Sequence, residues 1–119
     1  MVDMRGVYLQ GRILDIGGGG EGVIYRLCGN GVSAIDKRRD ELLKSPDIGL
    51  KSVMDACNMD YLDCSFDVVT CFFSLMYMQE DELPRVLSEA YRVLKPGGQL
   101  SIWDAVMPPI PTADVLLYR

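Results

Sequence analysis

The sequence of 119 residues contains no histidine. This absence excludes the Ser-His and Cys-His nucleophile pairs, a histidine general base and every metal site that includes an imidazole. The four cysteines include no Cys-x-x-Cys pair, so the sequence predicts neither a structural zinc site nor a redox dithiol. We interpret all of them as small buried apolar residues: Cys28, Cys57, Cys64 and Cys71.

Basic residues and long apolar runs are also few. The chain has 12 Lys and Arg against 17 Asp and Glu, which disfavours a nucleic-acid partner because phosphate binding needs clustered Lys and Arg. The longest uncharged apolar stretch, 68–78, is shorter than the roughly 18–20 residues that a membrane helix needs. The N-terminus has no long apolar region of the kind found in signal peptides. We therefore expect no membrane partner, and reduced cysteines predict a cytoplasmic location.

Short apolar runs with strand character alternate with segments of helical periodicity, which is typical of a parallel sheet with crossover helices. We expect strands at 12–16, 32–36, 50–55, 66–72, 100–103 and 115–118. We expect helices at 21–28, 38–44 and 80–94, with a turn at 95–98. The length allows one α/β domain over 1–119, with an open, mostly parallel sheet, a core at about 12–104 and a Pro-rich tail at 105–119.

A run of glycines from Gly17 to Gly20 separates the first expected strand from the first helix. Glycine lets the backbone turn sharply and approach a ligand without a Cβ, while free amides at the helix start face that ligand. The spacing Gly17-x-Gly19-x-x-Gly22 matches the dinucleotide fingerprint, and Asp36 ends the second strand, where a carboxylate accepts hydrogen bonds from ribose hydroxyls. The pattern predicts a nucleoside-like ligand and leaves the cofactor open; a glycine turn without a ligand is the alternative.

Asp15 lies two residues before the first of these glycines. A carboxylate at this place would repel the pyrophosphate of a dinucleotide. It would favour a cofactor with a cationic end, such as S-adenosylmethionine, which carries an ammonium, a sulfonium and no phosphate. The structural alternative is that Asp15 binds the backbone amides of its own turn, and both roles can coexist.

Five segments, in this order and spacing, resemble the class I S-adenosylmethionine-dependent methyltransferases, and most closely the small-molecule enzymes of the quinone-biosynthesis type. The segments are Ile13–Gly19, Asp36, Asp55–Ala56, Ser65–Val69 and Val93–Leu100. The resemblance implies a Rossmann-like methyltransferase sheet, S-adenosylmethionine as cofactor with S-adenosylhomocysteine as product, and a small-molecule methyl acceptor. We name no catalytic base, because sulfonium is already an activated leaving group and the protein mainly has to position the reactants.

The resemblance also assigns cofactor-binding roles. Gly17 and Gly19 would line the methionine part, and Asp36 would hold the ribose diol. Asp55 would accept from the adenine amino group, beside Ala56. Cys71 and Phe72 would flank the sulfonium. With Lys37, which is either a ligand contact beside Asp36 or a solvated helix start, the expected set is Asp15, Gly17, Gly18, Gly19, Asp36, Lys37, Asp55, Ala56, Cys71 and Phe72.

The chain departs from the family in two places. Glu21 stands where the family has its third glycine, which leaves the roles of Gly20, Glu21 and Gly22 open. The family's sheet has seven strands in the order 3-2-1-4-5-7-6, and this chain ends near the start of the last hairpin. We therefore expect strand 100–103 to be an edge that either mediates self-association, the favoured outcome, or is covered by 115–118.

Two alternative functions stay open. The first is a truncated, non-catalytic domain that binds S-adenosylmethionine. The second, disfavoured by Asp15 and by the pair Asp55–Ala56, is an NAD-dependent oxidoreductase.

Overall fold

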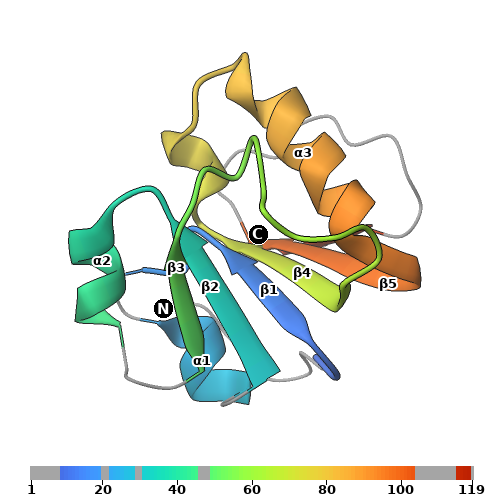
Figure 1. Ribbon diagram of the computed structural model, residues 1–119, viewed down its shortest axis with the longest axis horizontal. Coiled ribbons are helices and arrows are strands. Elements are labelled where there is room, and N and C mark those ends of the chain that lie inside the picture. Colours follow the sequence, from blue (N-terminus) through green and yellow to red (C-terminus); the bar gives the residue numbers. More distant parts are fainter. Residues whose placement is uncertain (1–8, 20–21, 29–30, 46–48, 104–114, 119) are drawn as a thin grey trace.

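The computed structural model describes residues 9–19, 22–28, 31–45, 49–103 and 115–118. Within these ranges six strands form one sheet in the order β3-β2-β1-β4-β5-β6, and every neighbouring pair is parallel (Figure 1). The strands are β1 Ile13–Ile16, β2 Val32–Asp36, β3 Leu50–Val53, β4 Phe66–Phe72, β5 Leu94–Trp103 and β6 Val115–Tyr118. The helices are α1 Val23–Cys28, α2 Arg39–Lys44, α3 Glu82–Val93 and the short 3-10 helix η2 Leu75–Tyr77. The expected open, parallel α/β sheet is confirmed.

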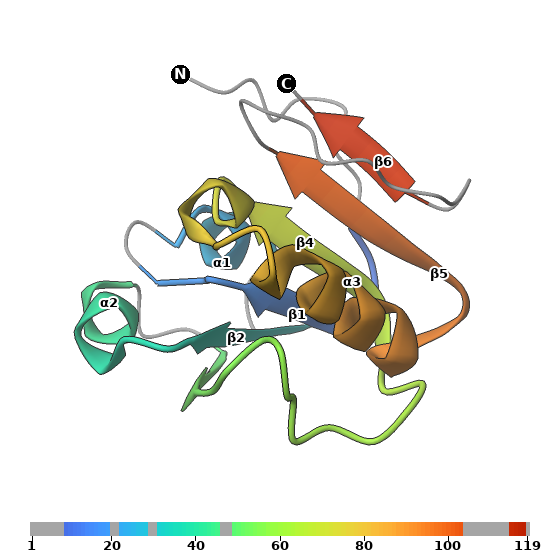
Figure 2. The ribbon, with the colours of Figure 1, turned by 90° about the horizontal axis from the view of Figure 1, so that it is seen from above.

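The two faces of the sheet are buried by different helices (Figure 2). Successive residues of a strand point to opposite faces. Ile13 of β1 accordingly packs in one apolar cluster with Ile24 of α1, whereas Leu14 packs in another with Val86 and Ala90 of α3. This alternation explains why the central strands are apolar on both faces. None of the helices in the described part of the chain is long and apolar enough to cross a bilayer.

Several predicted element bounds differ from the structure by one or two residues, and the start of the fifth strand differs by six. The fifth strand begins at Leu94 rather than at residue 100, because Leu94 pairs with Phe66 of β4. The expected turn at 95–98 becomes an irregularity inside β5, where Gly97 has a φ of 77°. The helix α1 has 6 residues rather than the predicted 8, and in it Ile24 is buried while Leu27 is 43% exposed.

The edge of the sheet beside β5 is occupied by β6. The two strands pair in parallel, with Leu100 opposite Val115 and Trp103 opposite Tyr118. The structure therefore shows the second of the two expected outcomes, in which the chain's own last strand covers β5. Self-association through β5 would require β6 to leave the sheet, and it stays a prediction.

Candidate functional site

A cavity of about 680 Å³ lies at the carboxyl ends of the strands, where parallel α/β sheets bind their ligands. Its volume falls within the range of about 300–1,000 Å³ that is usual for small-molecule sites. The residues that line it come from the ends of β1, β2 and β4, from the segments after β3 and β4, and from α2 and α3. They are Ile16, Gly17, Gly19, Ile35, Asp36, Lys37, Arg38, Glu41, Met54, Asp55, Ala56, Phe72, Phe73, Ser74, Tyr77, Met78, Glu82 and Val86.

The turn after β1 is held by its neighbours on both sides. The backbone N–H groups of Gly17 and Gly18 both donate to the carbonyl of Ile35 in β2, at 2.8 and 3.1 Å. Ser74, just after β4, donates its hydroxyl to the carbonyl of Ile16 at 2.9 Å. Gly17 has a φ of 71°, and a Cβ there would lie 2.5 Å from the Cβ of Ser74. The amides of Gly17 and Gly18 are thus hydrogen-bonded within the protein.

Gly19 has a structural role that its sequence motif does not predict. It lines the cavity, but a Cβ added to it would lie 2.6 Å from the Cβ and 2.7 Å from the carbonyl carbon of Glu41 in α2. The absence of a side chain therefore lets α2 pack directly on the glycine turn. Gly20 and Glu21 lie outside the described residues, whereas Gly22 has a φ of 63°.

The two carboxylates expected at the nucleoside end lie at the ends of neighbouring strands. Asp36 ends β2, and its carbonyl accepts the N–H of Met54, which precedes Asp55. One carboxylate oxygen of Asp36 accepts the N–H of Arg38 at 3.0 Å, and one of Asp55 accepts the N–H of Cys57 at 2.8 Å. Both side chains are fixed at the cavity by local backbone donors, and each has a second oxygen with which to accept a hydrogen bond.

Lys37, which follows β2, and Glu82 of α3 both line the cavity and contact each other. The ammonium of Lys37 donates to Oε2 of Glu82 at 2.8 Å and lies 3.9 Å from Oδ1 of Asp55. Their hydrogen bond raises the pKa of Lys37 and lowers the pKa of Glu82. Glu82 was not expected here, although its spacing from Val86 and Ala90, both on the buried face of α3, is a signal that would have found it.

Asp15 lies beneath the glycine turn and away from the cavity surface. It is 2% exposed, and its Oδ1 accepts the hydroxyl hydrogen of Thr70 at 2.8 Å. Burial raises the pKa of Asp15 to about 7, although the hydrogen bond from Thr70 acts in the opposite direction. Gly18 packs against Asp15 and Ala34, and Cys71 is fully buried. Asp15, Gly18 and Cys71 do not line the cavity, so their roles as cofactor contacts stay predictions.

Aromatic side chains form the other end of the site. The ring of Phe72 lies 5.0 Å from that of Phe73 and 5.5 Å from that of Trp103. Phe73 has a φ of 51°, a conformation that favours glycine, and its N–H donates to the carbonyl of Trp103 at 2.7 Å. This bond fixes the segment after β4 against the end of β5.

The cysteines are only partly as expected. Cys71 is buried, but Cys28 and Cys57 are half-buried and Cys64 is exposed with a φ of 57°. The interpretation of all four as buried apolar residues is therefore wrong for Cys64. Its N–H donates to the carbonyl of Arg92, so a backbone contact rather than burial positions it.

Comparison with known proteins decides the family. A family profile described as "Methyltransferase domain" matches residues 14–102. This chain belongs to the methyltransferase-domain family. The resemblance found in the sequence motifs is thereby confirmed, and the fold agrees with it.

Relatives of this methyltransferase domain share its sequence over different lengths. The 27-O-demethylrifamycin SV methyltransferase of Amycolatopsis mediterranei is 36% identical over 112 residues, which cover 84% of this chain and 40% of that protein. A demethylmenaquinone methyltransferase of Listeria welshimeri is 48% identical over 61 residues, or 48% of this chain and 23% of that protein. A SAM-dependent methyltransferase of Methanosarcina mazei superposes with a TM-score of 0.68 at 28% identity, covering 84% of this chain and 56% of that one. The chain thus spans less than half the length of the curated relatives it matches.

Proposed function

We propose that this domain binds S-adenosylmethionine in the cavity at the strand ends and transfers its methyl group to a small-molecule acceptor. The observation that carries the proposal is the pair Asp36 and Asp55, which line one cavity from the ends of adjacent strands in a methyltransferase fold. Carboxylates accept hydrogen bonds from hydroxyl and amino groups, which suits Asp36 to the ribose and Asp55, beside Ala56, to the adenine.

The charges around the cavity fit this cofactor better than a dinucleotide. Four carboxylates and two cationic side chains line it: Asp36, Glu41, Asp55, Glu82, Lys37 and Arg38. An excess of negative charge favours a ligand with cationic groups and disfavours a pyrophosphate. Gly17, Gly19 and Phe72 would adjoin the methionine end, where the bound sulfonium supplies an activated methyl group. The chain's own contribution is to hold the ligand in place and exclude water.

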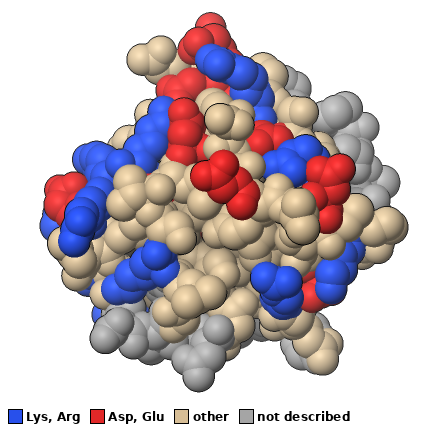
Figure 3. Space-filling model, viewed as in Figure 1, with Lys and Arg blue, Asp and Glu red and all other residues tan. Residues whose placement is uncertain are grey.

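The aromatic end of the cavity supports a small apolar acceptor. Phe72, Phe73, Tyr77 and Met78 line it and carry no charge. Figure 3 shows basic and acidic side chains interspersed on one face of the domain, which supports an acceptor other than nucleic acid. The four cysteines form no disulfides with one another in the described part of the chain, which supports a cytoplasmic location.

Two assays test the proposal. The unfolding temperature should rise with S-adenosylmethionine and S-adenosylhomocysteine and stay unchanged with NAD. Only a ligand that binds the folded state stabilises it. Methyl transfer from labelled S-adenosylmethionine to apolar aromatic acceptors would then separate an enzyme from a domain that only binds the cofactor. Stabilisation by NAD alone would contradict the assignment.

A further inference from the structure

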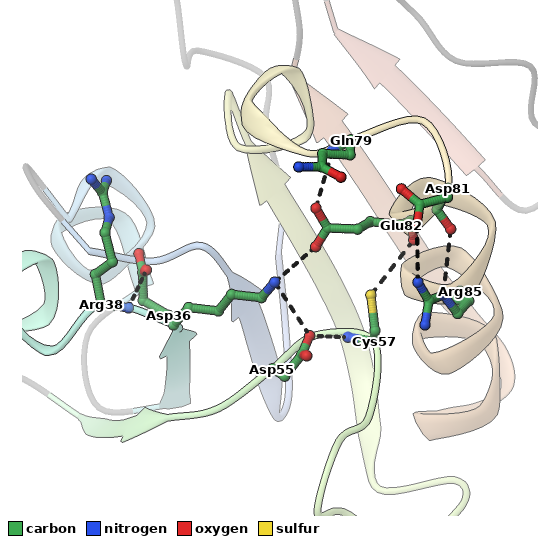
Figure 4. Close-up of polar contacts among 9 residues, drawn as sticks. Asp36, Arg38, Asp55, Cys57, Gln79, Asp81, Glu82 and Arg85 are labelled. Carbon is green, nitrogen blue, oxygen red and sulfur yellow. Dashed lines mark hydrogen bonds and ion pairs between the residues drawn. The ribbon is translucent and has the colours of Figure 1, made fainter.

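The nucleoside end of the cavity is bounded by three segments that are distant in sequence. They are the end of β2 with Lys37, the segment after β3 with Asp55, and the first turn of α3 with Glu82. The ammonium of Lys37 lies between the two carboxylates, at 2.8 Å from Glu82 and 3.9 Å from Asp55. Figure 4 shows Asp55 and Glu82 reaching toward one another from separate elements. One side chain therefore connects all three walls.

Glu82 is the fixed member of the bridge. Its Oε1 accepts the N–H of Gln79 at 3.1 Å, while the N–H of Glu82 donates to the carbonyl of Gln79. This reciprocal pairing at a helix start orients the carboxylate. The side chain of Glu82 is 18% exposed, whereas that of Lys37 is 56% exposed. Lys37 is consequently the member that can swing away without disturbing the core.

Without the ammonium, two like charges would face each other across the cavity. The charge of Asp55 acts to raise the pKa of Glu82, against the larger lowering by Lys37. Removal of Lys37 would therefore leave a repulsion that pushes the loop after β3 and the start of α3 apart. A ligand held between these walls would then leave more readily.

We propose that the ion pair between Lys37, just after β2, and Glu82 of α3 closes the nucleoside end of the cavity. This ion pair sets the rate at which a bound nucleoside ligand dissociates. The inference rests on the proposed function, because the ligand in question is S-adenosylmethionine or its product. Lys37 acts through Asp55 and Glu82 and is thus a positioning residue.

Lys44 provides a matched control. It forms an ion pair of 3.1 Å with Glu41, and its side chain is 62% exposed. That pair lies within one helix and connects no walls of the cavity. Lys44→Met and Lys37→Met remove the same charge from a comparably exposed site, so a difference between them reports the bridge itself.

The test measures the dissociation rate of S-adenosylhomocysteine by stopped flow and its affinity by calorimetry. Lys37→Met should speed dissociation about two- to fivefold, the range expected for a partly exposed ion pair. The dissociation rate from Lys44→Met should match that of wild type. The rate from Lys37→Arg should be close to that of wild type, because arginine keeps the positive charge. Salt at about 0.5 M should bring the dissociation rate of wild type close to that of Lys37→Met, because salt screens the ion pair. S-adenosylhomocysteine should dissociate more slowly from the charge-exchange variant, Lys37→Glu with Glu82→Lys, than from either single variant.

Equal dissociation rates for Lys37→Met and Lys44→Met would overturn the proposal. Dissociation from the charge-exchange variant that is as fast as from the single variants would also overturn it. Titration of Glu82 by NMR in the ligand-free chain is an independent readout. Lys37→Met should raise the pKa of Glu82, and an unchanged value would overturn the bridge. A wild-type chain that binds no S-adenosylhomocysteine but shows this shift would instead overturn the proposed function.

Discussion

Replacement of Asp15 by asparagine should change how stability depends on pH. Asp15 is buried and its pKa rises from 3.8 to about 7 on folding, because desolvation disfavours the charged form. The folded state therefore holds a proton that the unfolded state releases between about pH 4 and 7. The stability associated with this proton is fully present below the unfolded pKa and is lost as the pH rises through the folded one.

The size of the effect follows from these two values. One unit of pKa difference corresponds to about 1.4 kcal/mol, so the rise from 3.8 to about 7 amounts to about 4 kcal/mol in total. About 2–3 kcal/mol of this falls between pH 5 and pH 8. Asparagine does not titrate, so the free energy of unfolding of wild type should fall by this amount relative to that of Asp15→Asn over that interval.

Urea unfolding at several pH values measures the difference. With a slope of about 1–3 kcal/mol per M, the midpoint of wild type should fall by about 1–2 M relative to Asp15→Asn between pH 5 and pH 8. Thr70→Val should move the loss to higher pH, because the hydrogen bond from Thr70 lowers the pKa of Asp15. Parallel profiles for wild type and Asp15→Asn would refute the reasoning.

Three further predictions concern packing. Gly19→Ala should lower the free energy of unfolding by about 1–3 kcal/mol, with Gly19→Val worse, because a Cβ would meet the backbone of Glu41; thermal unfolding measures this. Arg92→Lys should cost about 1–3 kcal/mol in urea unfolding, because the guanidinium donates to the carbonyls of Met59 and Tyr61 and a lysine cannot reproduce that fork; stability equal to wild type would contradict this. A chain ending at Trp103 should self-associate in light scattering, because it loses the strand that pairs with β5; a monomer at every concentration would contradict it.

Local sequence patterns predicted those elements whose ends are determined by nearby residues rather than by long-range contacts. The strands β2, β4 and β6 have the predicted bounds, and β4 is apolar on both faces, as a central parallel strand should be. The start of β5 could not be predicted, because Pro96 and Gly97 indicate a turn while the pairing of Leu94 with β4 is a long-range contact.

The same distinction applies to the site. Asp36 is the last residue of β2 and Asp55 comes two residues after the end of β3, so a motif sufficed to place them at the cavity. The bridge from Lys37 to Glu82 joins residues 45 positions apart, which no local spacing reveals. Asp15 belongs to the expected motif, but the two-residue period of its strand directs it into the sheet face toward Thr70.

Calorimetric titration of S-adenosylhomocysteine into wild type and Asp36→Ala tests the central claim most directly. Asp36 ends a strand at the cavity, so its truncation should leave the fold intact while removing a charged acceptor from the ribose. The loss of such hydrogen bonds costs about 1.5–3 kcal/mol, or roughly ten- to hundredfold in affinity. We expect wild type to bind and the folded variant to bind that much more weakly. Equal affinity in a folded Asp36→Ala, or no binding by wild type, would contradict the account.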